Sequence, residues 1–372
     1  MIKILHILAT LDKGSGVANV VMNYYRNIDK NRIQFDFLYF VKTEKNYIKE
    51  IEKNGGNVFF MEKPSIRGYK KYKNFIHGFF SKHEGTYSAI HLHEAYLNLF
   101  VFPVAKKYGI KNCISHVHTT KYSDKKLNSL RNRILCFPLR KQATILMACS
   151  KAAGAFYYGS RAIKEKKIIV LNNAILCNIF RFNPTVRENY RQKLKIENKL
   201  VVGHVGRFNE QKNHLFLISI FKKVLERNPE SVLLLIGNGK LKNMIKKEVI
   251  RAGLEDQVLF LGERNDVPYL MQAMDVFILP SLFEGLPVSG IEAQASGLPC
   301  VFSDTITREV SINDVLYLGL HEKPEIWAEN VYKMALNNIE KNRIIGEVNV
   351  KKAGYDIEIQ SQLLENFYQK LN

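Results

Sequence analysis

Apolar runs of strand length alternate along this chain with longer segments in which apolar residues recur at helical spacing. In the first half, the strand-like runs lie at residues 3–8, 35–40, 56–61, 89–93, 112–118, 143–149 and 167–171. Strands that alternate with helices form parallel sheets covered by helices on both faces. The first half of the chain therefore predicts a doubly wound α/β domain.

The second half repeats this alternation, with strand-like runs at residues 200–206, 231–237, 257–262, 275–280 and 298–303. Two such series predict an α/β protein of two doubly wound, Rossmann-like domains that face a cleft. Turn-forming residues gather near 172–185, so we place one domain at 1–175 and the other at 176–355. The amphipathic segment 356–372 is expected to form a terminal helix that packs back on the first domain.

The composition is that of a globular protein, with 46% hydrophobic and 24% charged residues among 372. No apolar run approaches the roughly 20 residues that a membrane span needs. The N-terminal residues lack a small-residue cleavage site, so we expect no signal peptide. The five cysteines are scattered and form no C-x-x-C pair, which favours reduced thiols in a cytoplasmic protein without a metal framework.

The charge is concentrated in the first half of the chain. Residues 1–175 hold 30 Lys/Arg and 11 Asp/Glu, whereas residues 176–372 hold 25 and 24. This asymmetry predicts an anionic partner for the first half: a membrane surface, a phosphorylated acceptor or nucleic acid. The alternative is a lysine-rich surface that is simply well solvated.

Two basic segments, 67–83 and 121–141, place aromatic and apolar residues at helical spacing between lysines and arginines. Basic amphipathic helices of this kind lie on anionic membrane surfaces, so we expect peripheral attachment to a membrane. The alternative for such a stripe is a core-facing helix with a solvated lysine face.

The stretch "FEGLPVSGIEAQASGLP" (283–299) carries the main chemical signal. Glu284 lies in the loop at the carboxyl end of the strand-like run 275–280, where ligands of open α/β sheets bind. Glu292 follows inside the next helix. Two carboxylates in one cleft are natural partners for the paired hydroxyls of a ribose or a hexose. The alternative is two unrelated surface glutamates around an ordinary turn.

The residues around these carboxylates predict the local backbone. Gly285 allows a ligand to approach the chain closely, and Pro287 suits the first turn of a helix. That helix is expected over 288–296, with Gly297 ending it. Its free N–H groups and positive dipole end favour an anion, such as a diphosphate.

The stretch 283–299 resembles the E-x7-E signature of retaining GT-B glycosyltransferases of family 4, in particular the bacterial exopolysaccharide and capsular polysaccharide branch. Other segments share the resemblance, which covers most of the chain: "HVGRFNEQKNH" (204–214), "LLLIGNGKLKNMI" (233–245), "ATILMACSKAAG" (143–154) and "IIVLNNAI" (168–175). The resemblance implies the GT-B fold, with an N-terminal acceptor domain and a C-terminal domain for the nucleotide-sugar donor.

The resemblance also implies roles for the donor side. Glu284 would bind the hydroxyls of the donor sugar, and Glu292 those of the ribose. Arg207 and Lys212 would hold the diphosphate, because permanent cations stabilise the negative charge that develops on a leaving group. Further donor contacts are expected from the backbone at Gly206, Gly285, Leu286 and Pro287.

The resemblance implies two more positions on the donor side, Gly16 and Arg264. Gly16, in the first glycine loop, would lie against the diphosphate from the opposite side of the cleft. Many family members carry a glutamate where this chain has Ala18, so no acidic contact is expected there. Arg264 occupies a position that usually meets the nucleobase through its backbone.

Histidines end two strand-like runs of the first half: His91 and His93 on one, His116 and His118 on the other. Histidine is a common metal ligand, but we expect no metal site here, because no carboxylate set accompanies them beyond Glu94 and the chain has no Asp-x-Asp pair. By resemblance, His118 would contact the donor sugar or the attacking hydroxyl. His93 and His116 would lie on the acceptor side. The alternative is histidines whose hydrogen bonds are satisfied within the sheet.

The resemblance thus implies a cytoplasmic enzyme at the inner face of the plasma membrane. It would move a hexose or N-acetylhexosamine from a nucleotide-sugar, expected to be a UDP-sugar, to a lipid-diphosphate-linked glycan in surface polysaccharide biosynthesis. We expect no metal or other cofactor. Retention by double displacement needs a carboxylate nucleophile near the anomeric carbon. No residue of the sequence is a clear candidate for this nucleophile, which favours front-face displacement.

Two alternatives remain at this point: a nucleotide-sugar epimerase of GT-B fold, and a non-catalytic nucleotide-sugar-binding subunit. Nucleic acid is not expected as a partner. The chain carries no recognition motif for it, and an acidic pair in the cleft repels phosphate.

Overall fold

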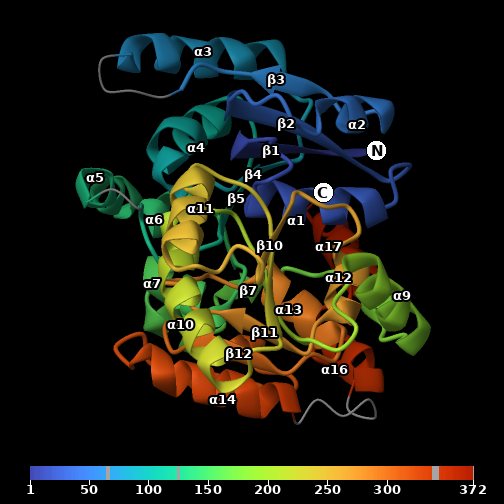
Figure 1. Ribbon diagram of the computed structural model, residues 1–372. Coiled ribbons are helices and arrows are strands. Elements are labelled where there is room, and N and C mark those ends of the chain that lie inside the picture. Colours follow the sequence, from blue (N-terminus) through green and yellow to red (C-terminus); the bar gives the residue numbers. More distant parts are fainter. Residues whose placement is uncertain (64–67, 124–125, 337–342, 372) are drawn as a thin grey trace. The chain divides into compact units, whose positions relative to one another are not determined.

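The computed structural model describes residues 1–63, 68–123, 126–336 and 343–371, and the chain divides into two compact units. Unit 1 comprises Met1–Ala174 and Ile357–Asn372, and unit 2 comprises Ile175–Asp356. Each unit has its own parallel sheet with helices on both sides (Figure 1). The predicted fold class, two Rossmann-like α/β domains, is therefore confirmed.

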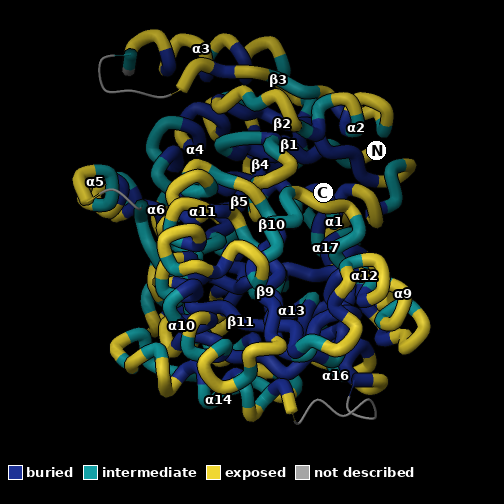
Figure 2. Tube along the Cα trace, in the orientation of Figure 1, coloured by how far each residue is buried: buried dark blue, intermediate teal, exposed yellow. Residues whose placement is uncertain are grey.

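The sheet of unit 1 has seven strands in the order β3-β2-β1-β4-β5-β6-β7, all parallel. Its central strands are buried along most of their length, as Figure 2 shows in dark blue. This is the continuous burial that apolar runs without alternation predict. The strands are β1 (Ile2–Thr10), β2 (Ile33–Val41), β3 (Val58–Phe60), β4 (Ala89–Leu92), β5 (Asn112–Val117), β6 (Ile145–Ala148) and β7 (Ile168–Val170).

Helices cover both faces of this sheet. On one face, α1 and the C-terminal α17 pack against each other, and the Tyr25 ring of α1 stacks on Phe35 with 5.3 Å between centroids. On the other, the Tyr158 hydroxyl of α7 donates to the Ser115 carbonyl at 2.8 Å. The helices are α1 (Gly16–Asn27), α2 (Ile48–Lys53), α3 (Tyr69–Lys82), α4 (Asn98–Lys107), α5 (Lys126–Cys136), α6 (Leu139–Gln142), α7 (Lys151–Tyr158), α8 (Ser160–Lys164) and α17 (Ile357–Gln369), with a 3-10 turn at η1 (Ala95–Leu97).

Helix α3 corrects one expectation from the sequence. Its apolar residues Tyr72, Ile76 and Phe79 are 6%, 0% and 8% exposed, and the Phe79 ring packs on Phe59 of β3 at 5.1 Å. The stripe of segment 67–83 therefore belongs to the core, and the lysines form a solvated outer face, as the alternative interpretation held. Arg67 of this segment, like residues 124–125 of the second basic segment, lies outside the described residues.

The sheet of unit 2 has six parallel strands in the order β10-β9-β8-β11-β12-β13. The edge strand β13 was not predicted, because its residues are half-buried throughout and stand out little from the flanking sequence. The strands are β8 (Leu200–Val205), β9 (Ser231–Ile236), β10 (Val258–Gly262), β11 (Val276–Leu279), β12 (Cys300–Ser303) and β13 (Val315–Leu318).

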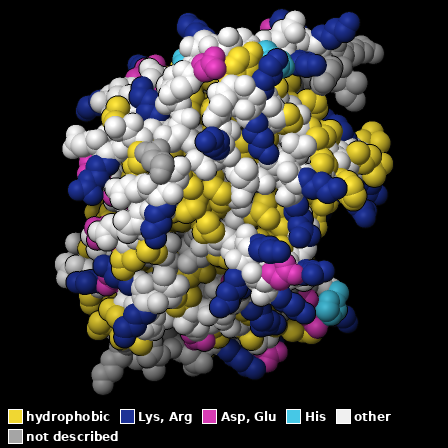
Figure 3. Space-filling model, turned by 180° about the vertical axis from the view of Figure 1, so that it is seen from behind, with side chains coloured by type: hydrophobic (Ala, Val, Ile, Leu, Met, Phe, Trp, Pro, Cys, Tyr) yellow, Lys and Arg dark blue, Asp and Glu magenta, His cyan; other side chains and the backbone are white. Residues whose placement is uncertain are grey.

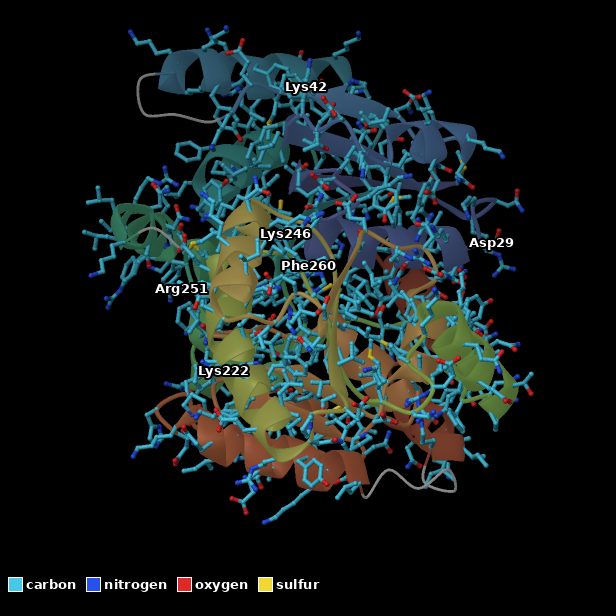
Figure 4. All side chains as sticks on the ribbon, viewed as in Figure 1. Asp29, Lys42, Lys222, Lys246, Arg251 and Phe260 are labelled. Carbon is cyan, nitrogen blue, oxygen red and sulfur yellow. The ribbon has the colours of Figure 1, made fainter. Side chains whose placement is uncertain are left out.

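The core of unit 2 lies between this sheet and helices α10 and α14, where Phe221 and Trp327 are both fully buried. On α11, the Lys246 ammonium lies over the Phe260 ring at 5.6 Å from its centroid (Figure 4). The helices are α9 (Pro184–Leu194), α10 (His214–Arg227), α11 (Lys242–Arg251), α12 (Val267–Ala273), α13 (Val288–Ala295), α14 (Pro324–Leu336) and α16 (Gly346–Lys352), with 3-10 turns at η2 (Cys177–Phe180), η3 (Glu210–Lys212) and η4 (Arg308–Val310).

In neither unit does any described helix have both the length and the apolar character that crossing a membrane requires.

Candidate active site

The topology of unit 2 locates its candidate site. Strand β8 lies between β9 and β11, so the chain leaves β8 towards one edge of the sheet and leaves β11 towards the other. Such a switch point opens a crevice at the carboxyl ends of the strands, where open α/β sheets bind ligands. The loops after the two strands meet there, since the Leu282 N–H donates to the Gln211 carbonyl at 2.8 Å.

A buried carboxylate and a lysine join these two loops. The Lys212 ammonium lies 2.8 Å from Glu284 Oε1, and the Gln211 amide donates to Glu284 Oε2 at 3.1 Å. Glu284 is only 6% exposed. The Asn209 side chain accepts from the Lys212 N–H at 3.2 Å and so fixes the turn that carries the lysine. Because an ammonium has three donors, Lys212 can hold Glu284 and a ligand anion together.

Glu292 of α13 adds a second carboxylate to this site. It is half-buried, and burial raises its pKa to about 7, although the nearby positive charge of Lys212 opposes the shift. A carboxyl group that titrates near neutrality in a crevice is a mark of functional sites. Lys212 thus lies within electrostatic range of both members of the E-x7-E pair.

Helix α13 begins and ends close to where the sequence predicts. It spans Val288–Ala295, with Pro287 just before its first turn and no side chain capping its start. The helix therefore presents N–H groups at its N-terminal end that a ligand anion can use. Gly297 follows with a φ of +67°, and a Cβ there would lie 2.2 Å from the Arg343 Cα, so only glycine fits.

Three glycines, Gly206, Gly237 and Gly239, allow the backbone beside Lys212 to pack closely. A Cβ on Gly237, where φ is +133°, would lie 2.1 Å from the Gly206 carbonyl oxygen, and one on Gly239 would lie 2.5 Å from that of Phe208. The loop after β9 therefore packs backbone to backbone on the loop after β8. At Gly206 itself a Cβ would lie 3.0 Å from Lys212 Cε, so its absence leaves room for the lysine side chain.

The two arginines of the predicted donor side have different surroundings. Arg207 is exposed in the loop after β8. Arg264 forms two hydrogen bonds with Asp266, at 2.7 and 2.6 Å, and the Tyr190 hydroxyl donates to the same carboxylate at 3.0 Å. The Arg264 guanidinium is the main cause that lowers the pKa of Asp266 to about 2. Its side chain is thus held by Asp266.

The predicted residues of unit 1 lie apart in the sequence, and the structure brings the histidines together. His93 Nδ1 lies 2.8 Å from His118 Nε2, and His116 Nδ1 lies 3.0 Å from His91 Nε2. Sequence reasoning missed His6, which joins the group through His93 at 3.0 Å. The pairing of β1 with β4 brings it there, and a single sequence does not give that register.

Gly16 is the first residue of α1, whose N-cap is Ser15. A Cβ built on Gly16 would meet no atom within 4 Å, so the space beside the start of this helix is open within the described structure.

Gln211, whose amide donates to Glu284, is a second residue that sequence reasoning missed. Its only sequence signal is its place beside Lys212.

Fold and site together define an α/β protein with a polar, mixed-charge crevice at a topological switch point, the class that binds nucleotides and their conjugates. Residues 186–353 match the family model described as glycosyl transferases group 1. The chain is 35% identical to a putative glycosyltransferase, EpsF of Bacillus subtilis (strain 168), over 98% of this chain and 96% of that protein. The chain belongs to the glycosyltransferase group 1 family and is a glycosyltransferase.

Two other relatives carry more specific names. The chain is 30% identical to the UDP-Gal:alpha-D-GlcNAc-diphosphoundecaprenol alpha-1,3-galactosyltransferase of Escherichia coli, over 59% of this chain and 58% of that one. It is 24% identical to the capsular polysaccharide biosynthesis glycosyltransferase CapH of Staphylococcus aureus, over 99% of both.

Among solved structures, Anabaena HepE in complex with UDP and glucose superposes with a TM-score of 0.80 at 18% identity, over 99% of this chain and 100% of that chain. Sucrose-phosphate synthase from Thermosynechococcus elongatus gives a TM-score of 0.80 at 15% identity, over 100% and 99%. At these identities the likeness establishes the GT-B fold alone.

Proposed function

We propose that this chain is a retaining family 4 glycosyltransferase of surface polysaccharide biosynthesis that needs no metal ion for transfer. It moves a hexose or N-acetylhexosamine from a nucleotide-sugar, with UDP as the carrier, to a lipid-diphosphate-linked glycan. The observation that carries the proposal is the contact of Lys212 with Glu284 at the switch point of unit 2, with Glu292 within reach of the same charge.

This arrangement suits a nucleotide-sugar donor. Lys212, together with Arg207 from the same loop, supplies positive charge for the diphosphate and stabilises it as the glycosidic bond breaks. Glu284 accepts hydrogen bonds from the sugar, and Glu292 from the ribose. The backbone of Gly285, Leu286 and Pro287, at the start of α13, completes the donor contacts.

The surroundings of Glu284 favour front-face displacement over a covalent intermediate. Both of its oxygens accept hydrogen bonds, one from Lys212 and one from Gln211. A carboxylate held by a cation on one oxygen and an amide on the other is a poor nucleophile. The leaving diphosphate then takes the proton of the acceptor hydroxyl. Capture of a glycosyl–Glu284 adduct would contradict this mechanism.

Roles in unit 1 follow the same proposal. His118 contacts the donor sugar or the attacking hydroxyl, His93 and His116 lie on the acceptor side, and Gly16 faces the diphosphate. The open space at the Gly16 Cβ position is compatible with a ligand there. Arg264 meets the nucleobase through its backbone, since its side chain is held by Asp266.

The relatives support the choice of carrier and acceptor. The Escherichia coli relative takes UDP-Gal and a diphosphoundecaprenol-linked sugar, as its name states. HepE, which shares the fold, has been solved with UDP-glucose. For this chain we therefore propose a UDP-sugar and a lipid-diphosphate acceptor.

A lipid-linked acceptor requires that the enzyme reach a membrane surface, and α5 offers a suitable face. Leu127, Leu130, Ile134 and Phe137 are 84%, 60%, 64% and 91% exposed. Leu127, Leu130 and Ile134 lie at helical spacing on one side of α5, and Phe137 directly follows the last residue of the helix. Figure 3 shows hydrophobic side chains with Lys and Arg around them at the edge where α5 lies. We call these four residues the α5 apolar face.

The charge around the α5 apolar face indicates what covers it. Lys126, Arg131 and Arg133 are exposed on the same helix, and Arg140 and Lys141 follow in α6. Apolar side chains ringed by cations fit the boundary between headgroups and acyl chains of an anionic bilayer. We therefore propose peripheral attachment to the inner face of the plasma membrane through α5, in place of α3.

The transfer reaction is tested with the purified chain, a panel of nucleotide-sugars, and a short-chain polyprenyl-diphosphate N-acetylhexosamine as acceptor, in EDTA. The proposal predicts consumption of a UDP-sugar and a disaccharide product whose new linkage keeps the anomeric configuration of the donor, read by NMR. An inverted linkage would exclude retention, and isomerised donor without transfer would indicate an epimerase.

A further inference from the structure

Five histidine side chains gather on one face of the unit 1 sheet, and glycosyl transfer as proposed uses only some of them. They come from the adjacent strands β1, β4 and β5, and the register places His6 directly beside His91. The histidine cluster consists of His6, His91, His93, His116 and His118.

Two hydrogen-bonded chains run through the cluster. In the first, His118 Nε2 lies 2.8 Å from His93 Nδ1, and His93 Nε2 lies 3.0 Å from His6 Nδ1. The outer nitrogens of this chain, His118 Nδ1 and His6 Nε2, are buried and have no hydrogen-bond partner among the described residues.

In the second chain, His116 Nδ1 lies 3.0 Å from His91 Nε2, and His91 Nδ1 lies 2.6 Å from the Tyr368 hydroxyl of α17. His116 Nε2 is left buried without a partner among the described residues. A buried polar atom without a partner costs free energy, so each of these nitrogens calls for an explanation.

Burial favours the neutral form of all five rings. Burial lowers the pKa of His6 and of His118 to about 3. Burial and the neighbouring histidines lower the pKa of the other three well below the ordinary value. A neutral imidazole offers one lone pair, which either accepts a hydrogen bond or binds a metal ion.

Three of these lone pairs can converge on one ion. A ring nitrogen from each of His93, His116 and His118 lies within 4.8 Å of the others. In a tetrahedral zinc site, with Zn–N bonds of about 2.0–2.1 Å, the ligand nitrogens lie about 3.3 Å apart. Closing the set around an ion therefore requires the nitrogens to approach one another by at most about 1.5 Å.

We propose that His93, His116 and His118 form a binding site for a borderline transition-metal ion, with Zn²⁺ as the ion that fits this ligand set. Three histidines with an open fourth position form a known type of zinc site, and imidazole nitrogen suits zinc. This ion takes no part in the transfer proposed above. By occupying His118 it competes with the sugar or the acceptor and slows transfer, a consequence that rests on the proposed function.

The rest of the cluster supplies the outer shell of this site. With His116 Nε2 on the metal, its Nδ1–H donates to His91, which in turn is held by Tyr368. With His93 Nδ1 on the metal, its Nε2–H donates to His6. Metal-bound histidines almost always donate their second ring N–H in this way, which fixes the tautomer and the ring orientation.

A second set, His6, His91 and His93, also brings its nitrogens within 4.8 Å. It is less suited to an ion, because all three of its residues are buried. In the proposed set His118 is half-buried and gives an ion a way in.

The site is tested by zinc binding to the full chain without any nucleotide-sugar. After treatment with EDTA and removal of the chelator, the protein is titrated with Zn²⁺ against a chromophoric competitor. The proposal predicts one equivalent per chain. His116→Asn and His93→Asn should weaken binding at least tenfold, and His6→Asn about tenfold through the outer shell. Bound Co²⁺ should give a visible spectrum that His116→Asn abolishes.

His321→Asn is the matched control, because the His321 side chain is 80% exposed in unit 2. If His116→Asn fails to fold, His118→Asn at the half-buried position replaces it. Absence of stoichiometric zinc, binding that survives loss of His93 and His116, or binding lost in His321→Asn would each overturn the proposal. Since binding is read without activity, a chain that binds zinc but transfers no sugar would refute only the proposed function.

Discussion

At the scale of single residues, the proposed donor site depends most on Lys212. It pairs with Glu284, which is largely withdrawn from water, and its charge also favours the ionised form of Glu292. Lys212 thus contacts one carboxylate of the pair directly and favours in the other the ionised form, which accepts hydrogen bonds from sugar hydroxyls, and it has donors left for a diphosphate.

We predict that Lys212→Met lowers kcat at least a hundredfold, because charge on the leaving diphosphate loses its cation. The variant should also lose about 3 kcal/mol of unfolding free energy, because Glu284 stays buried without its partner. Initial rates and urea denaturation measure the two effects. Lys240→Met is the control: Lys240 pairs with Glu210 and both are 68% exposed, so stability should change by less than about 0.5 kcal/mol. A wild-type rate in Lys212→Met would contradict the assignment.

Glu292 predicts a pH dependence of stability. Its pKa in the folded chain is raised to about 7, so between about pH 4.3 and 7 the folded state binds more protons than the unfolded state. Wild-type stability should therefore fall as pH rises through this window, whereas Glu292→Gln should lack this fall. Well above pH 7 the variant should be more stable by roughly 3–4 kcal/mol, and near pH 4.5 the difference should vanish. Urea denaturation at several pH values checks this, and a difference independent of pH would refute it.

At the scale of elements, two loops and one helix build the site, and glycines set how closely they pack. The backbone of the loop after β9 packs closely on the loop after β8 at Gly237 and Gly239. This packing supports the turn that carries Lys212. The length of α13 is set by Pro287 and Gly297 at its two ends.

We predict that Gly237→Ala raises the KM for the donor several-fold and destabilises unit 2 by about 3 kcal/mol or more. Its Cβ would lie 2.1 Å from a backbone oxygen that cannot yield without moving the loop of Lys212. Gly253→Ala is the matched control, because Gly253 also has a positive φ, +66°, but open space around it. It should cost about 1 kcal/mol and leave KM unchanged. Equal KM values for both variants would show that the packing of the loop after β9 does not position Lys212.

The sequence predicted what depends on local pattern. Continuous apolar runs gave all strands but β13, which lies at an edge and is half-buried, and proline and glycine marked the ends of α13. Contacts between distant segments could not be derived. The register of β1 on β4 brings His6 to the other histidines, and only tertiary packing decides that the apolar stripe of α3 is buried while that of α5 is exposed.

At the scale of the whole molecule, the two halves of the chain differ in charge as the proposed substrates require. Residues 1–175 carry nearly all of the excess positive charge, and α5, with its exposed apolar face, belongs to this half. The proposed donor site lies in the nearly neutral half. This division of charge suits the proposed transfer, in which the basic half faces an anionic membrane and the other half binds the donor.

We predict that the chain floats with vesicles containing anionic phosphatidylglycerol and not with neutral ones, and that high salt weakens binding. Leu130→Gln combined with Phe137→Gln should abolish flotation by removing two of the anchoring side chains. The control combines Leu215→Gln and Ile250→Gln, which are 45% and 60% exposed in unit 2, and should float like the wild type. Flotation that ignores lipid charge, or loss in the control, would contradict attachment through α5.

The most direct test of the donor site is calorimetric titration of UDP into the purified chain in the presence of EDTA. The account predicts binding without metal, weakened at least tenfold by Glu292→Ala and unchanged by Glu210→Ala, since the Glu210 side chain is 68% exposed in the turn that carries Lys212. Absence of UDP binding, or affinity equal in both variants, would contradict a donor site built on Lys212, Glu284 and Glu292.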